Sequence, residues 1–316
     1  MKRLTLVIPC YNEEESLPIL YKELQKISQI LSDYEIEYIF VDDGSKDKTL
    51  RLLRELAQAD SRVKFLSFSR NFGKEAAIYA GLSHCSGDYI ALLDADMQDP
   101  PGLLPEMLQI LENNEDDYDC VATRRVNRDG EPPIRSWFAK MFYKIINKLS
   151  DIEIADGARD FRLMKKYVVD SIVAMKEYHR FSKGIFAWVG FKTKWLEYKN
   201  VERSAGATKW SFRKLLSYSI GGIIDFSTAP LKVAAVTGIL FFIISMIFIV
   251  VIVVRTFLFG DSVAGWPSLV SIILMIGGIQ LFCIGILGSY LAKTYLEIKN
   301  RPIFLLKETN FKINRL

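Results

Sequence analysis

Two long stretches near the end of the chain carry no charged residue, and they restrict the fold more than any other feature. They are residues 233–254 (VAAVTGILFFIISMIFIVVIVV) and residues 268–292 (SLVSIILMIGGIQLFCIGILGSYLA). As helices, with a rise of about 1.5 Å per residue, each would cover roughly 30 Å, the thickness of a bilayer's hydrocarbon core. Helices buried in a soluble domain rarely stay uncharged on every face for so long. We therefore predict two membrane spans.

The charges around these stretches predict how the chain is oriented. The short connection RTFLFGDSVAGWP (255–267) offers only Arg255 against Asp261. The tail after the second stretch is basic, with Lys293, Lys299, Arg301, Lys307, Lys312 and Arg315. Because basic loops stay on the cytoplasmic side, we expect both termini and the N-terminal part in the cytoplasm, at the inner or plasma membrane. The apolar run of MKRLTLVIP stops at Pro9, too early for a signal peptide.

Cysteine and histidine are too sparse to suggest a stabilising cross-link or a zinc site. The four cysteines (Cys10, Cys85, Cys120 and Cys283) form no CxxC pair, and the chain has two histidines. Neither a disulfide framework nor a zinc site follows from this pattern. A reducing cytoplasm fits it.

Strand and helix patterns alternate along the first 230 residues. Apolar, β-rich runs occur at 4–9, 37–43, 63–69, 89–96 and 119–124, and helical patterns occur between them at 13–31, 47–58 and 74–84. This order predicts an α/β domain, Rossmann-like, with a mostly parallel sheet and helices on both faces. Ligands of such folds bind beyond the carboxyl ends of the strands.

Acidic residues gather at that edge of the predicted sheet. PCYNEE follows the first strand, DDGS (42–45) the second, and Asp94-Ala95-Asp96 the fourth. Crowded carboxylates raise one another's pKa unless a cation compensates them. Mg²⁺ or Mn²⁺ suits this role, because each takes one or two carboxylates and fills its other positions with substrate phosphate oxygens. A lone DxD would more often be a solvated turn, but here it stands among other acids, and a nucleoside diphosphate is the expected ligand.

Seven motifs in order carry a resemblance that spans nearly the whole chain. They are IPCYNEE (8–14), VDDGSKDKT (41–49), RNFGKEAAIYAG (70–81), DADMQDPP (94–101), DGARDFRL (156–163), RFSKGIFAWVGF (180–191) and VERSAGATKWSF (201–212). With the two spans, the chain resembles the inverting family 2 glycosyltransferases of the GT-A fold. Among them it is similar to the membrane-anchored polyprenyl-phosphate glycosyltransferases, which include dolichol-phosphate mannose synthase and the bactoprenol glucosyltransferases.

The resemblance implies a donor site and a metal site. Asp94, Asp96 and Gln98 would hold the diphosphate and the metal, with Asp94 and Asp96 as its ligands. Asp42 would contact the uracil or the ribose. Four residues would border the nucleotide base and ribose: Pro9, Tyr11, Asn12 and Glu13.

Several of these assignments have plainer alternatives. Tyr11 could be a core aromatic residue, and Glu13 an acid favoured at a helix start by the helix dipole. Lys74, at a predicted helix start where a cation is unfavourable, could face a sugar or a phosphate. Arg124 matches a family arginine near the diphosphate, with Arg125 as the alternative register.

The acceptor side is expected at the membrane surface. Arg135 heads RSWFAKMFYKIINKL, whose apolar residues form one helical face. That helix either packs on the domain or lies in the membrane interface. Arg203 and Lys209 precede a second amphipathic stretch, 211–226. They are either a basic collar beside the span or, as the resemblance implies, ligands of the lipid phosphate.

The implied reaction is an inverting transfer of a hexose to a polyprenyl phosphate. The metal would neutralise the departing nucleoside diphosphate while a phosphate oxygen attacks the anomeric carbon. Asp156 matches the family's proposed base, supported by Arg162, and Asp160 is a weaker candidate. A phosphate monoester with a pKa of about 6 is already ionised at neutral pH, so Asp156 could instead orient the acceptor or stabilise charge on the sugar.

We expect a catalytic domain at 1–210 that includes the amphipathic helix 135–150, a juxtamembrane helix at 211–229, two spans at 230–293 and a basic tail at 294–316. The favoured activity is transfer of glucose from UDP-glucose to undecaprenyl phosphate, that is, a metal-dependent hexosyltransferase (EC 2.4.1). UDP-GlcNAc, UDP-galactose and GDP-mannose stay open as donors.

Two other function classes are weaker, and the partners follow from the favoured one. A processive polysaccharide synthase would need more spans and a QxxRW motif, and a silent scaffold would not need these acids. No nucleic-acid partner is expected. Lipid flipping would fall to a separate protein, since two spans cannot easily enclose a pore. Small residues in the second span leave a homo-oligomer open.

Overall fold

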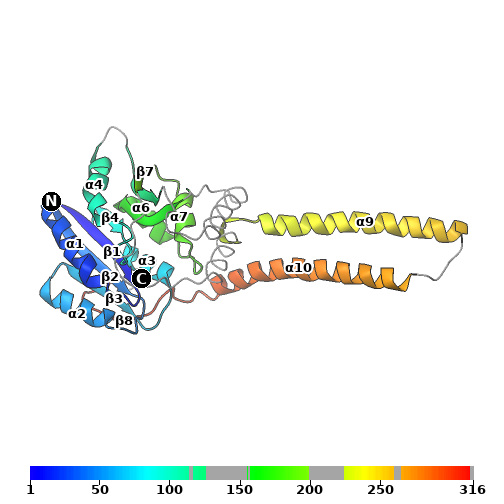
Figure 1. The fold of residues 1–316 in the computed structure, drawn as a ribbon, viewed down its shortest axis with the longest axis horizontal. Coiled ribbons are helices and arrows are strands. Elements are labelled where there is room, and N and C mark those ends of the chain that lie inside the picture. The colour runs from blue at the N-terminus through cyan, green and yellow to red at the C-terminus, as the bar shows by residue number, and fades with distance from the viewer. Residues whose placement is uncertain (114–116, 126–154, 156, 199–223, 260–264, 314–316) are drawn as a thin grey trace.

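The computed structural model describes the chain except for residues 114–116, 126–154, 156, 199–223, 260–264 and 314–316. The described residues form an α/β domain from which two long helices project to one side (Figure 1). The strands are β1 (Lys2–Cys10), β2 (Tyr34–Asp42), β3 (Val63–Phe68), β4 (Tyr89–Leu92), β5 (Cys120–Arg125), β6 (Ala158–Lys165), β7 (Thr193–Tyr198) and β8 (Leu306–Thr309). The helices are α1 (Leu17–Ile30), α2 (Thr49–Ala59), α3 (Lys74–Ser83), the 3-10 turn η1 (Pro101–Leu103), α4 (Leu104–Glu112), α6 (Lys166–Ala174), α7 (Ser182–Trp188), α9 (Ala229–Phe259) and α10 (Trp266–Ile298).

The strands form one mixed sheet in the order β7-β5-β6-β4-β1-β2-β3-β8. β1 pairs in parallel with β2 and β4, β2 with β3, and β5 with β7. β6 runs antiparallel between β4 and β5, and β8 runs antiparallel at the edge beside β3. The prediction of a mostly parallel sheet is confirmed.

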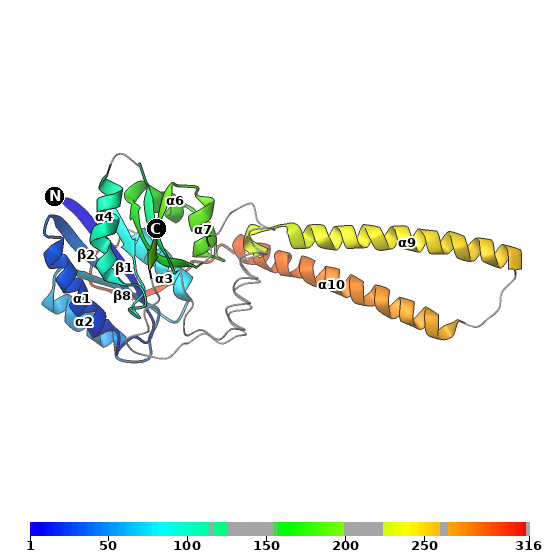
Figure 2. The same ribbon diagram turned by 45° about the horizontal axis from the view of Figure 1, so that its top comes forward.

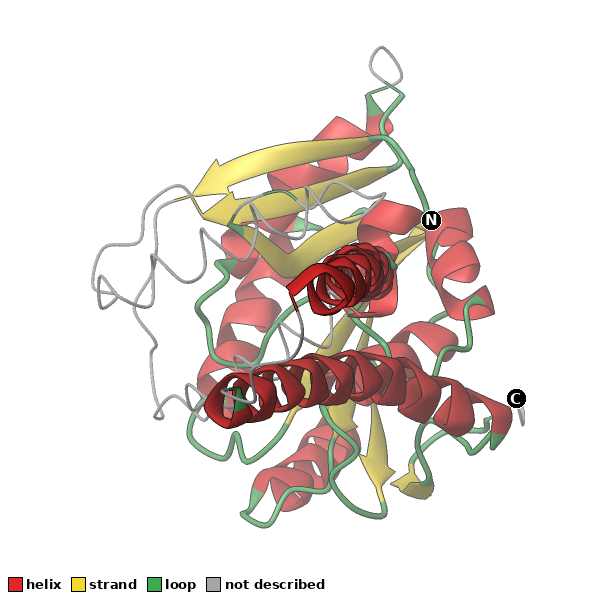
Figure 3. Cartoon of the chain, turned by 90° about the vertical axis from the view of Figure 1, so that its right-hand side faces the viewer, coloured by secondary structure: helices red, strands yellow, loops and turns green. Residues whose placement is uncertain are grey.

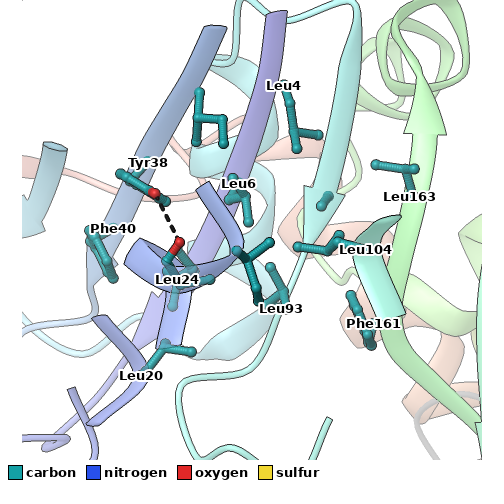
Figure 4. Packing of buried hydrophobic residues seen from close by; sticks show 14 of the residues in the cluster. Leu4, Leu6, Leu20, Leu24, Tyr38, Phe40, Leu93, Leu104, Phe161 and Leu163 are labelled. Atoms are coloured by element: carbon teal, nitrogen blue, oxygen red, sulfur yellow. Dashed lines mark hydrogen bonds between the residues drawn. The ribbon is translucent and has the colours of Figure 1, made fainter. Parts of the chain in front are cut away.

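Both faces of the sheet are covered, which explains why its central strands read as continuous apolar runs. Side chains alternate across β1, so Leu4 and Leu6 join the cluster under α1, α2 and α4, and Val7 joins the cluster under α3, α6 and α7. Figure 4 shows the first cluster, in which the Tyr38 hydroxyl donates to the backbone oxygen of Leu24 at 3.3 Å.

The two projecting helices are α9 and α10. Their segments Ala229–Phe248 and Met275–Ile298 are long and apolar enough to cross a membrane, and neither is buried in the protein. They contact each other and extend away from the domain, as Figure 2 shows, and Figure 3 looks along them toward the domain. At their base, Lys293 pairs with Asp225, and the Tyr290 hydroxyl donates to the backbone oxygen of Ser227 at 2.5 Å.

The residues after α10 return to the domain. β8 lies within the region expected as a basic tail, and it adds an edge strand beside β3. The ring of Phe304 stacks on Phe68 with 5.0 Å between centroids. The Asn310 side chain donates to Val63 O at 2.9 Å and accepts from Phe65 N at 2.8 Å. These contacts hold the tail on the exposed edge of the sheet.

The expected amphipathic helix 135–150 lies outside the described residues. Of the expected juxtamembrane helix 211–229, only 224–229 are described. The domain limits therefore stay predictions.

Candidate active site

The described site centres on Lys74, the first residue of α3. Its Nζ lies 2.7 Å from Asp94 Oδ1, 2.8 Å from Asp94 Oδ2 and 2.5 Å from Asp160 Oδ2. Asp94 follows β4, and Asp160 comes from the neighbouring strand β6. The lysine thus joins the DADMQDPP motif to the DGARDFRL motif, two segments that are far apart in the sequence.

The electrostatics of this triad favour its charged form. Burial alone would raise the pKa of Asp160, but the charge of Lys74, followed by that of Lys183, holds this pKa well below its usual range. Burial would also lower the pKa of Lys74, but Asp160 and Asp94 raise it above its ordinary value. Asp160 therefore stays an anion at neutral pH and does not act as a general acid.

The turn after Asp94 carries further polar side chains. Asp96 Oδ1 accepts from Gln98 N at 3.2 Å, and Met97 between them has a φ of 60°. Gln98 Oε1 accepts from Arg159 at 3.3 Å. Asp94, Asp96 and Gln98 are half-buried, and both oxygens of Asp94 contact Lys74.

Asp99 is a buried acid that sequence reasoning did not single out. It accepts from Arg159 Nε at 2.9 Å and from the hydroxyl of Tyr198. Burial raises its pKa, whereas the charge of Arg159 acts in the opposite direction. These contacts fix the far end of the DADMQDPP turn to β6 and β7. Asp99 belongs to the DADMQDPP motif, but the sequence alone does not show which acid of the motif faces the protein interior.

Asp94 and Asp96 are suited to bind a divalent metal ion whose remaining ligands would come from the substrate. Within the described parts of the chain, no group of three or more His, Cys, Asp or Glu side chains could hold a metal ion. Two carboxylates in one turn match the way Mg²⁺ binds, through one or two carboxylates and the phosphates of its substrate. A complete protein cage is not required for such a site.

Asp42 and Asp43, at the end of β2, both hold loops. Asp42 Oδ2 accepts from Ser67 Oγ at 2.8 Å, and its Oδ1 accepts from Ser45 N at 3.0 Å. Asp43 accepts from Phe72 N at 2.6 Å and from Gly73 N at 3.0 Å, directly before Lys74. Burial raises the pKa of Asp43 to about 6. Sequence reasoning missed this second acid of the DDGS motif.

The residues after β1 are tied to the same loops. Asn12 has a φ of 54°, its Oδ1 accepts from Lys46 N at 2.8 Å, and its own N donates to Ser45 Oγ at 2.9 Å. Glu13 N donates to Thr49 Oγ1 at 2.8 Å. Pro9 is buried in β1, and Tyr11 is half-buried just beyond it. Pro9, Tyr11, Asn12, Glu13 and Asp42 therefore lie around one edge of the sheet, and their contact with a nucleotide stays a prediction.

Arg124 and Arg162, the two predicted site arginines that the structure describes, differ in their surroundings. Arg124 lies in β5, and its Nε donates to Glu197 Oε1 on β7 at 3.0 Å. Arg162 is buried in β6, its guanidinium lies 3.4 Å from the centre of the Phe186 ring, and it donates to Arg159 O at 3.3 Å. Asp156, Arg135, Arg203 and Lys209 lie outside the described residues, so their assignments stay predictions.

This fold, with acids and a lysine beyond the carboxyl ends of a mostly parallel sheet, defines an α/β enzyme of the GT-A-like type. The chain belongs to glycosyl transferase family 2, whose model matches residues 5–173. It is 41% identical over 305 residues to a prophage bactoprenol glucosyl transferase homolog of Escherichia coli (strain K12), covering 96% of this chain and 98% of that one. It is 40% identical over 308 residues to an SfII prophage-derived bactoprenol glucosyl transferase of Shigella flexneri, covering 98% of each.

A solved structure with a similar arrangement is glucosyl-3-phosphoglycerate synthase from Mycobacterium tuberculosis, in complex with Mn²⁺, UDP-glucose and phosphoglyceric acid. It has 17% sequence identity and a TM-score of 0.47, over 71% of this chain and 78% of that one.

Proposed function

We propose that the protein transfers glucose from UDP-glucose to a polyprenyl phosphate, undecaprenyl phosphate in a bacterium, with inversion at the anomeric carbon. The observation that carries this proposal is similarity at 40% identity over 98% of the chain to a bactoprenol glucosyl transferase, which includes both apolar helices. The domain and the helix pair are thus shared as one unit.

The described residues have defined roles in this proposal. A divalent metal, Mg²⁺ or Mn²⁺, held by Asp94 and Asp96, would neutralise charge on the leaving diphosphate. Lys74 fixes the orientation of Asp94, because it contacts both oxygens of that carboxylate. Asp160 presents a permanent negative charge beside Lys74 and would favour positive charge developing on the sugar.

The lipid acceptor would stay in the membrane, which α9 and α10 would cross. The base of α9 and the base of α10 are joined by the Asp225–Lys293 ion pair, so both helices leave the domain on one side. We place the domain and both termini in the cytoplasm, where nucleotide sugars are found. Flipping of the product would require a separate protein.

Incubation of the purified protein with a panel of nucleotide sugars and a short polyprenyl phosphate tests the activity. Mass spectrometry should find a polyprenyl-phosphate hexose, formed fastest from UDP-glucose. A preference for UDP-GlcNAc, UDP-galactose or GDP-mannose would correct the donor, and the absence of any lipid product would refute the activity.

The metal is tested in the same assay. Chelator should abolish transfer, Mg²⁺ or Mn²⁺ should restore it, and Asp96→Asn should lose activity while keeping its melting temperature. Full activity in chelator would exclude the metal site.

A further inference from the structure

Lys183 is a cation near the active site that forms no ion pair with a described carboxylate, although its charge acts on Asp160 from a longer distance. It is the second residue of α7 and is half-buried. Among the described residues, no carboxylate pairs with its ammonium, whereas Lys74 is shared between two acids. Lys183 therefore leaves a positive charge that is available to an anion.

The start of α7 is fixed to the triad. Glu75 follows Lys74 in α3, and its carboxylate accepts from Ser182 N at 2.9 Å and from the Ser182 hydroxyl. The charge of Lys183 is one of those that hold the pKa of Asp160 low. Because Ser182 is tied to the residue after Lys74, Lys183 is held on the side of the site formed by α3 and β6.

The same short helix also faces the base of the spans. The rings of Phe181 and Phe226 lie with 6.0 Å between centroids, and Phe226 comes three residues before α9. A Cβ atom at Gly184 would lie 2.5 Å from Phe226 Cε2, so a larger residue would displace the Phe226 ring. In Figure 1, α7 lies on the side of the domain from which α9 and α10 extend. Lys183 is thus flanked by residues that contact the membrane-proximal segment.

These contacts indicate which substrate the Lys183 ammonium would bind. The donor nucleotide belongs at the ends of β1 and β2, where Asn12 and Asp42 fix the loops. The phosphate of a lipid acceptor, at the depth of the headgroups, must approach from the side of the spans. On the basis of the proposed function, we propose that Lys183 binds the phosphate group of the lipid acceptor, and that Glu75 positions α7 for this contact.

Steady-state kinetics on the full-length protein test this role. In Lys183→Gln, KM for a short polyprenyl phosphate should rise about tenfold or more, because a charge-assisted contact to phosphate is lost. KM for UDP-glucose should stay within about twofold of wild type, since only acceptor binding is affected. Lys183→Arg should restore most of the loss. The matched control is Lys176→Gln, which removes an exposed lysine from the loop between α6 and α7 and should leave both constants unchanged.

A binding measurement separates this inference from the activity itself. Purified protein in uncharged detergent, without donor, is titrated with short polyprenyl phosphate and, separately, with phosphatidylglycerol. Lys183→Gln should weaken only the first, by about tenfold. Failure of wild type to make a glycolipid while this selective loss persists would refute the proposed function and keep the inference. An equal loss for both lipids, an unchanged affinity, or a rise in KM for UDP-glucose alone would overturn the inference.

Discussion

Removal of Lys74 would test whether the ion triad is a structural and catalytic centre. Lys74→Met keeps the length of the side chain but leaves Asp94 and Asp160 without the ammonium that contacts both. The two carboxylates keep 20% and 16% of their side-chain surface exposed, so water replaces the lysine only in part. We expect both activity and stability to fall.

The size of the stability loss follows from burial. Removing one partner of a fully buried ion pair costs about 3–5 kcal/mol of stability, and removing one partner of an exposed pair costs under about 1 kcal/mol. Lys74 is 35% exposed, which places the triad between these limits. We expect a loss of about 3 kcal/mol, which for a domain of this size lowers the melting temperature by roughly 6–12 °C.

Thermal unfolding in detergent with chelator present measures this loss, because chelator prevents a metal from replacing the lysine. Lys166→Met is the matched control, since Lys166 also begins a helix and pairs with an aspartate, but on the exposed surface. It should cost under about 0.5 kcal/mol. The double variant Lys74→Met/Asp160→Asn should recover part of the loss by removing one unpaired charge. Equal shifts for the two lysines, or no recovery in the double variant, would refute the reasoning.

Three further changes test the surrounding structure by thermal unfolding. Asn310→Ala should cost about 2 kcal/mol, because it leaves the N–H of buried Phe65 without its partner; no loss would mean that the tail is not docked. Hydrogen bonds from Arg62 lower the pKa of Asp60 to about 2. The stabilisation that the Asp60 carboxylate gives to the folded protein is therefore present above about pH 4 and is lost as pH falls through about 2. Asp60→Asn should therefore cost about 1 kcal/mol at pH 7, after allowance for screening, and only a small part of that at pH 2; an equal cost at both would contradict this. Gly44→Ala should destabilise by over about 2 kcal/mol, since Gly44 has a φ of 65° and its Cβ would lie 2.4 Å from the backbone carbon of Arg70; a neutral result would contradict this.

The central parallel strands could be predicted because their signal is local. β1, β2, β3 and β4 are buried on both faces and read as apolar runs between helices. β6 (ARDFRLMK) gives no such run, because Asp160 and Arg162 occupy the face that turns to the site. β8 is four residues long and exists only as an addition to the edge of β3. Such strands depend on tertiary pairing, which composition does not encode.

The motifs predict which segments form the site, but they do not show which of their acids are used to hold loops. DDGS predicts a donor contact for Asp42, which stays a prediction, and the structure adds that Asp42 accepts from Ser45 and Ser67 while Asp43 holds the loop before α3. The sequence offers Asp160 only as a weaker catalytic candidate and does not indicate its contact with Lys74. Each distinction depends on which strand lies next to which, because β6 lies beside β4 in the sheet although residues 126–157 separate it from β5 in the sequence.

The contacts between helix bases and domain have a consequence for how the acceptor reaches the site. Glu297, near the end of α10, accepts from Tyr178 N at 2.9 Å and from His179 N at 3.3 Å. These residues lead directly into α7, whose first residue, Ser182, donates to Glu75, the residue after Lys74. The end of α10, the loop before α7 and the ion triad are therefore joined through hydrogen bonds and short stretches of chain. In the proposed function, a lipid phosphate would have little freedom in depth, so holding the triad at a fixed distance from α10 would bring donor and acceptor together without a large movement of the domain.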